Sequence, residues 1–112
     1  MKQVSCIVRP EKLDAVTSAL NKENVVGMTV SDVRGFGRQK GQVEHYRGEA
    51  YTIRFISKIK VDIVVHDEEV EKVVAAVSQA ARTGNVGDGK IFISDVSNAV
   101  RIRTGEKGAS AL

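Results

Sequence analysis

The sequence predicts an α+β fold in which a strand–helix–strand unit occurs twice. Three observations favour this fold. Apolar residues alternate in short runs, they recur at helical spacing in two longer segments, and the two halves align at one fixed offset. Ile7–Leu20 aligns with Val64–Val77, so that Leu13 matches Val70. Two such halves make a ferredoxin-like β-α-β-β-α-β arrangement.

In the first half, Gln3–Val8 reads as a strand. Pro10 suits the first turn of a helix, and apolar residues recur at helical spacing across Glu11–Asn24. Val25–Arg34 then alternates apolar and polar residues, which predicts a second strand.

The second half opens with strand-like runs at Tyr51–Ile56 and Lys58–Val65. Asp67 is placed to cap the next helix, which carries a stripe of valines along one side. Ile91–Val96 is the next predicted strand, and Ala99–Thr104 is predicted as a short C-terminal strand. Because both helices would cover one face of the sheet, the other apolar face needs a cover, and self-association is the simplest one.

The composition is that of one modest domain spanning residues 1–112. Apolar residues make up 42% of the chain and aromatic residues only 4%, so the core must be built from aliphatic side chains. The net charge of +3 is too small to indicate a nucleic-acid-binding protein, although it fits sites for small anions. The single cysteine, Cys6, lies in the apolar run Val4–Val8 and is read as a core thiol in a reducing compartment.

The location expected from the sequence is the cytoplasm. The start of the chain reaches charged residues almost at once, which does not resemble a signal peptide. No window approaches the ~20 apolar residues of a membrane span.

Two glycine-rich segments interrupt the pattern. Gly35–Ala50 has four glycines and few aliphatic residues, which predicts a long mobile loop with a function. Gly84–Lys90 matches the G-x-x-x-x-G-K part of a P-loop, but Ile91 replaces the required Ser or Thr, and the segment follows a helix instead of a strand. The segment is therefore no P-loop. Anion binding through backbone N–H groups and Lys90 remains open, as does a simple helix-to-strand turn.

Three arginines extend the anion-binding hypothesis. Arg101 and Arg103 lie two apart on a predicted strand and would share one face. Arg38 lies in the first glycine-rich segment. Guanidinium groups match phosphate oxygens well, so the combination indicates a polyphosphate site, although each arginine alone reads as a solvated surface residue.

Four blocks, in this order, resemble the PII family of signal-transduction proteins over nearly the whole chain: GFGRQKG (35–41), YRGEAY (46–51), TGNVGDGKIFISD (83–95) and VRIRTGE (100–106). The resemblance implies a homotrimer with ATP or ADP in three clefts between subunits. It also implies a long T-loop at about residues 37–55, a glycine-rich loop at about 82–90 and a C-terminal segment at about 102–112.

The resemblance further implies the residues of the site. On matching positions the nucleotide would contact Gly35, Gly37, Arg38, Gly87, Asp88, Gly89 and Lys90, with Thr29 near the adenine and with Arg101 and Arg103 reaching the phosphates from the neighbouring subunit. Gln39 matches a residue that helps to hold Mg²⁺ with ATP, and Lys58 matches the partner of a 2-oxoglutarate carboxylate. A keto acid can chelate the cation while a lysine neutralises its far end. From the residues alone, Lys58 is one cation of an exposed Lys58/Lys60 strand face.

The T-loop would carry the output to partner proteins. Tyr46, Arg47 and Glu49 are the expected partner contacts, and Tyr51 matches a tyrosine that is uridylylated or adenylylated in some relatives. Expected partners are an ammonium transporter and enzymes or regulators of nitrogen metabolism, with the membrane reached only through the transporter. Glu49 replaces a serine that is phosphorylated in some relatives, so this phosphorylation switch cannot operate here. Glu11 replaces a frequent aromatic residue after the proline, so a partner that requires the aromatic side chain is not implied.

Three alternatives have weaker support. A weak ATPase would need a catalytic set, but the two histidines, His45 and His66, lie in different elements and suggest no nucleophile–base pair. An RNA-recognition module shares the element order, yet Phe55 and Phe92 do not lie in an aromatic base-stacking motif. A PII-like nucleotide sensor without a 2-oxoglutarate response is the third. The sequence therefore predicts a regulator and no enzyme.

Overall fold

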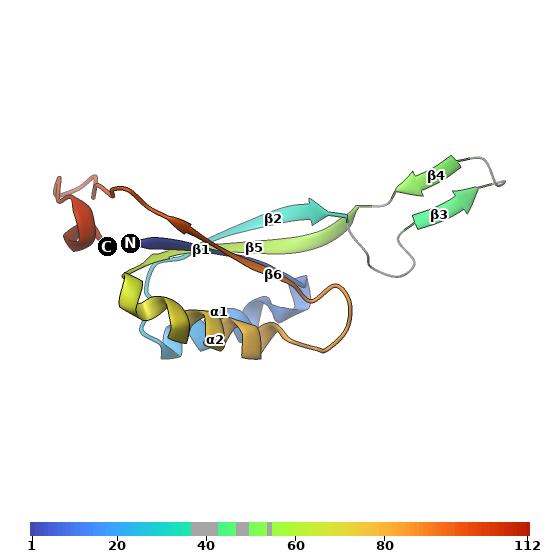
Figure 1. Ribbon diagram of the computed structural model, residues 1–112, viewed down its shortest axis with the longest axis horizontal. Coiled ribbons are helices and arrows are strands. Elements are labelled where there is room, and N and C mark those ends of the chain that lie inside the picture. The colour runs from blue at the N-terminus through green and yellow to red at the C-terminus, as the bar shows by residue number, and fades with distance from the viewer. Residues whose placement is uncertain (37–42, 47–49, 54) are drawn as a thin grey trace.

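The computed structural model describes residues 1–36, 43–46, 50–53 and 55–112. It has two layers, a four-stranded antiparallel sheet and two helices that lie on one of its faces (Figure 1). The strand order is β2 (Thr29–Gly35), β5 (Ile56–Val65), β1 (Lys2–Val8) and β6 (Gly89–Asp95). This order and the sequence of elements confirm the predicted β-α-β-β-α-β arrangement.

The two helices begin at positions that the internal repeat aligns. α1 starts at Leu13 and ends at Lys22, and α2 spans Val70–Ala81. Each follows a 3₁₀ turn, η1 (Pro10–Lys12) or η2 (Asp67–Glu69). The expected cap by Asp67 is wrong, because its carboxylate binds the Met1 ammonium at 2.9 Å instead of a helix N–H.

The core lies between the sheet and the helices. From Val4 in β1 and from Ile59 in β5, every second residue points to the helices and is buried, as period-2 alternation requires. The buried set is Val4, Cys6, Val8, Val16, Leu20, Val25, Ile59, Val61, Ile63, Val65, Val73, Val77 and Ala81. Cys6 is fully buried, and this burial raises the pKa of its thiol to about 11. Cys6 is therefore a core thiol, as predicted.

The opposite face of the sheet carries charged side chains among the apolar ones that the sequence predicts. The strand register places Lys58, Lys60 and Asp62 of β5 on this face, next to Ser5 and Ile7 of β1. Lys60 and Asp62 form an ion pair at 3.8 Å. Apolar side chains on the same face include Val64 of β5 and Phe92 of β6, so the face is mixed in character. Another chain that buries this face therefore has to provide partners for its charged side chains as well as apolar contacts.

The long loop contains regular structure and so corrects a second expectation. β3 (Val43–Tyr46) and β4 (Ala50–Ile53) pair as an antiparallel hairpin that extends away from the sheet (Figure 1). β-Branched and aromatic residues in both stretches favour extended backbone. The predicted strand Tyr51–Ile56 is thereby divided between β4 and β5. At the base of the hairpin the rings of Phe36 and Phe55 meet edge to face, with centroids 6.2 Å apart.

The predicted C-terminal strand at Ala99–Thr104 does not form. The described chain has only a single bridge there, between Val100 and Lys107. The Arg101 N–H donates to the Glu106 carbonyl at 2.8 Å, and Gly105, with φ of +75°, donates back to the Arg101 carbonyl at 2.8 Å. These bonds close a turn that leads to η3 (Gly108–Ala111). Within the described ranges, no helix has the length and apolar character needed to cross a membrane.

Candidate functional site

The glycine-rich loop connects α2 to β6 and depends on glycine at two points. Gly87 and Gly89 have φ of +105° and +106°, a region that side chains other than glycine rarely adopt. Gly89 also lies against β1, where an added Cβ would come within 1.7 Å of the Ile7 carbonyl oxygen. The loop therefore places bare backbone at the edge of the sheet.

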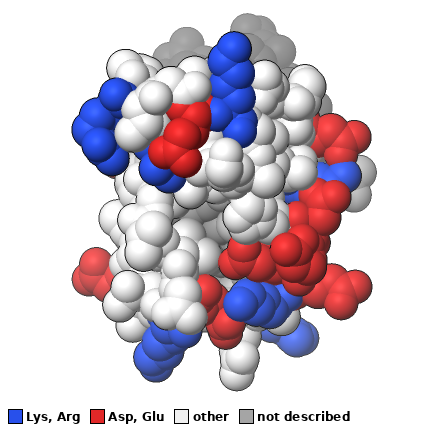
Figure 2. Space-filling model, turned by 90° about the vertical axis from the view of Figure 1, so that its left-hand side faces the viewer, with Lys and Arg blue, Asp and Glu red and all other residues white. Residues whose placement is uncertain are grey.

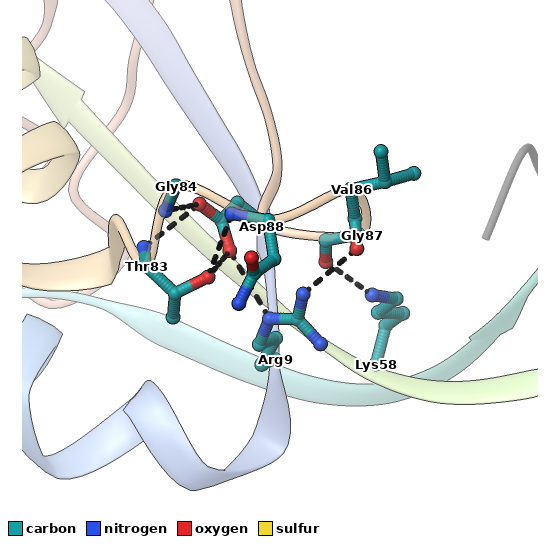
Figure 3. A network of polar contacts seen from close by, with 8 residues as sticks. Arg9, Lys58, Thr83, Gly84, Val86, Gly87 and Asp88 are labelled. Atoms are coloured by element: carbon teal, nitrogen blue, oxygen red, sulfur yellow. Dashed lines mark hydrogen bonds and ion pairs between the residues drawn. The ribbon is translucent and has the colours of Figure 1, made fainter. Parts of the chain in front are cut away.

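The carboxylate of Asp88 holds the loop from inside. Its Oδ2 accepts the N–H groups of Thr83 and Gly84, both at 2.8 Å. Its Oδ1 accepts the Thr83 hydroxyl and the Arg9 Nε, the latter at 3.1 Å (Figure 3). These bonds, with that from the Thr83 hydroxyl first, hold the pKa of Asp88 far below its usual range. Because both oxygens are engaged, we expect a contact between Asp88 and a ligand to come from its backbone.

Two cations, Arg9 just after β1 and Lys58 of β5, reach the other side of the loop (Figure 3). The Arg9 guanidinium donates to the Val86 carbonyl at 2.9 Å, and the Lys58 ammonium donates to the Gly87 carbonyl at 2.6 Å. Burial, and then the nearby Arg9 charge, lower the pKa of Lys58. Arg9 was missed at the sequence level, because no motif marks an isolated cation before Pro10 and its partners follow about eighty residues later.

Several predicted site residues gather at this end of the sheet. Lys90 is the second residue of β6 and faces the same side as Ile7, its partner in the register. Gly35, the last residue of β2, lies beside Lys58, whose Cγ is 3.8 Å from the position of an added Cβ. With Gly87, Asp88 and Gly89, these residues combine exposed backbone and positive charge, a surface suited to phosphate or carboxylate groups.

The other predicted residues lie at the far end. Thr29 opens β2 and lines a hollow of about 810 Å³ that also includes Asp62, Val64 and Leu112. Viewed from this end, uncharged side chains occupy the centre of the surface, with charged ones around it (Figure 2). Arg101 belongs to the same end, since it pairs with Glu106 at 3.0 Å and donates to the Leu112 carbonyl at 3.0 Å.

The prediction that Arg101 and Arg103 share a strand face is wrong. Arg101 lies in irregular chain and Arg103 in the exposed turn that follows. The seven residues of β6 span roughly 20 Å at ~3.3 Å per residue, and they separate the glycine-rich loop from this turn. One chain therefore does not bring all the predicted cations together.

The remaining predicted residues belong to the long loop. Gly37, Arg38, Gln39, Arg47 and Glu49 lie outside the described residues. Tyr46 and Tyr51 are in β3 and β4, where the register pairs them with Ala50 and His45. Their predicted roles stay predictions.

Comparisons with known proteins agree with one another. The profile of the family described as nitrogen regulatory protein P-II matches residues 1–106. A nitrogen regulatory protein P-II of Microchaete diplosiphon is 61% identical over 112 residues, and one of Nostoc punctiforme is 60% identical, each alignment covering 100% of both chains. A crystal structure of Arabidopsis thaliana PII bound to citrate superposes with a TM-score of 0.82 at 43% identity, covering 99% of this chain and 91% of that one.

Proposed function

The chain belongs to the nitrogen regulatory protein P-II family, and from this premise we propose that it is a homotrimeric sensor that binds ATP or ADP in clefts between subunits. Proteins of this family are signalling regulators of nitrogen metabolism and not enzymes. The proposal adds that 2-oxoglutarate binds together with Mg²⁺-ATP, and that the T-loop carries the result to target proteins in the cytoplasm.

The observation that carries the proposal is the division of the predicted cations between two ends of the sheet. Lys90 and the glycine-rich loop lie at one end, and Arg101 belongs to the other. A triphosphate is too short to contact both ends of one chain. Two neighbouring chains can supply both sets of groups, if the loop end of one subunit meets the C-terminal end of the next.

The residues at each end of the sheet are suited to binding a different part of a nucleotide. Around Gly87 and Gly89 the backbone lacks side chains, so phosphate oxygens can approach N–H groups while Lys90 adds charge. The guanidinium groups of Arg101 and Arg103 can form paired hydrogen bonds with phosphate oxygens. The hollow beside Thr29 contains apolar wall residues and the Asp62 carboxylate, which fits a purine ring with an amino group. The bound Mg²⁺ would neutralise phosphate charge, and Gln39 would help to hold it.

The 2-oxoglutarate part of the proposal rests on Lys58. Its ammonium is partly buried beside the glycine-rich loop and forms no ion pair within 4.0 Å in the described part of the chain. A carboxylate arriving there would meet a cation that is already partly desolvated. The relative from Arabidopsis thaliana was crystallised with citrate, a carboxylate ligand, which supports this chemistry. The alternative is a nucleotide sensor without a 2-oxoglutarate response.

The output would come from the hairpin of the T-loop. Tyr46, Arg47 and Glu49 are its proposed contacts with an ammonium transporter or with enzymes and regulators of nitrogen metabolism. Tyr51 is the proposed modification site, where a nucleotidyl group would add bulk and negative charge.

Calorimetric titration tests the ligands. We expect one ATP per chain with Mg²⁺ present, followed by 2-oxoglutarate binding only after ATP. ATP binding without the second response would leave the alternative sensor. Absence of any nucleotide binding would refute the phosphate site. Sedimentation should give a mass three times the 12.1 kDa of one chain.

Subunit mixing tests whether the site is shared. Lys90→Ala removes a cation at the loop end, and the double variant Arg101→Ala/Arg103→Ala removes the cations at the other end. Each variant alone should bind ATP weakly. Co-expressed mixed trimers should regain tight sites, because some clefts then combine an intact loop with intact arginines. Recovery would not occur if each site belonged to one chain.

A further inference from the structure

The glycine-rich loop is held by the side chain of Arg9, which is not among the predicted site residues. Arg9 follows the last residue of β1, so its backbone is fixed by the strand, and its side chain is only 16% exposed. We propose that Arg9 is a positioning residue that holds the glycine-rich loop in the shape that receives phosphate groups. This inference rests on the proposed nucleotide site.

The geometry of the contacts supports this role. The Nε of Arg9 binds the Asp88 carboxylate at 3.1 Å, and the terminal NH2 group binds the Val86 carbonyl at 2.9 Å (Figure 3). Val86 precedes Gly87 and Asp88 follows it. One planar guanidinium therefore holds both neighbours of Gly87, whose backbone has a φ of +105°.

The carboxylate of Asp88 extends this restraint to the start of the loop. Besides Arg9, it accepts hydrogen bonds from the backbone N–H groups of Thr83 and Gly84. A single chain of contacts thus runs from the end of β1 through Asp88 to the end of α2. Without the guanidinium, the ionised and only 23% exposed carboxylate would lose its one ion-pair partner among the described residues.

A lysine would replace this contact only in part. Its ammonium has a single centre of charge, whereas the guanidinium presents donors in a fixed plane and contacts two acceptors at once. Lysine at this position should keep the attraction to Asp88 and lose the simultaneous bond to Val86. Methionine should keep the packing of the stem and lose both polar contacts.

The experiment measures nucleotide binding and loop protection separately. Arg9→Met and Arg9→Lys are titrated with ATP and with adenosine, in the absence of 2-oxoglutarate. Hydrogen exchange of the amides at 83–89 is followed without any ligand. Lys72→Met, on the exposed side of α2, is the control for the loss of one positive charge.

We expect Arg9→Met to weaken ATP binding about tenfold or more, to leave adenosine binding unchanged and to speed exchange of the loop amides. Arg9→Lys should fall between this variant and the wild type. In an Asp88→Asn background the further effect of Arg9→Met should be much smaller, because the two residues act through one contact.

Three outcomes would overturn the inference. ATP binding equal to the wild type would show that the loop does not need Arg9. Weaker ATP binding with unchanged amide exchange would mean direct contact with the ligand in place of positioning. Unchanged exchange together with a wild type that binds no ATP would refute both this inference and the proposed site. Faster exchange in that case would refute the nucleotide site alone.

Discussion

The glycine-rich loop and the C-terminal extension (residues 98–112) use similar residues in different ways. Both contain glycines at positive φ and both contain cations. The loop is held by the sheet, through Arg9 and Lys58. The extension is held mainly by itself, through the Arg101–Glu106 pair and the bridge between Val100 and Lys107.

Both regions expose apolar side chains: Val86 of the loop is 65% exposed, and two residues of the extension are exposed as well. On the extension, Val100 is 56% exposed and Ile102 is 99% exposed, although both are aliphatic. A segment that keeps its own shape and exposes such side chains is suited to binding another surface. The loop is therefore held by contacts within the chain, whereas the exposed side chains of the extension are available to the neighbouring subunit of the proposed trimer.

The largest expected effect is on the loop. Gly89→Ala should destabilise the fold by about 3 kcal/mol, because the new Cβ would overlap the Ile7 carbonyl and φ is +106°. Urea unfolding measures the change. Gly27→Ala is the matched control, since its Cβ meets no atom within 4 Å, and its unfolding free energy should change by less than ~0.5 kcal/mol. Equal curves for the two variants would contradict the described contact of loop and strand.

The next effect is on assembly. Ile102→Asp should leave the fold of each chain intact and convert the proposed trimer to smaller species, because an isoleucine buried at an interface contributes about 1.5–3 kcal/mol and a carboxylate there would be desolvated. Sedimentation velocity and circular dichroism measure the two properties. Ser18→Asp, on the exposed side of α1, should stay trimeric. A trimeric Ile102→Asp variant would place the interface elsewhere.

A pH series separates Asp88 from ordinary carboxylates. Its folded-state pKa lies far below the unfolded value of about 3.9, so its ionised form contributes stability that is fully present above that value. The contribution is lost as pH falls from about 4 through the folded pKa. The difference in unfolding free energy between wild type and Asp88→Asn should be constant from about pH 5 to 8 and shrink below about pH 4. A difference that changes near neutral pH would point to another group.

The smallest expected effect is within the extension. The Asn98 side-chain oxygen accepts the Gly108 N–H at 3.0 Å and helps to close the segment. Asn98→Ala should cost about 1 kcal/mol or less in the folding of this segment. Amide exchange at Gly108 should increase only modestly, because its N–H also donates to the Ala99 carbonyl at 2.9 Å, while exchange of the loop amides at 83–89 stays the same. A joint increase would show that the two regions are coupled within one chain.

The parts of the fold that sequence patterns predicted are those set by local periodicity. The valine stripe of α2 and the alternation in β5 depend on neighbours three or two residues away, and both elements were found. The strand expected at Ala99–Thr104 shows the limit of this reasoning. Val100 and Ile102 alternate with arginines as in a strand, but the Arg101–Glu106 contacts and Gly105 close a turn that alternation does not reveal.

The candidate site was predictable where glycines and lysine form a motif, as at 84–90. The groups that shape this loop were not predicted, because the family resemblance places Asp88 among the ligand contacts and Arg9 belongs to no motif. The link between Arg9 and Asp88 joins the end of one strand to the loop before another, so only the folded chain brings them together. The charged side chains of the uncovered sheet face were partly predictable, because Lys58 and Lys60 alternate with the buried residues of β5.

The separation of the two sets of cations has a consequence for how the proposed sensor responds to its own concentration. If each nucleotide is held by two chains, binding and association are linked equilibria, and each strengthens the other by the same factor. Dilution would then lower the apparent affinity for ATP, and ATP would keep dilute chains assembled. Such a regulator would report nucleotide levels faithfully only above a threshold amount of protein.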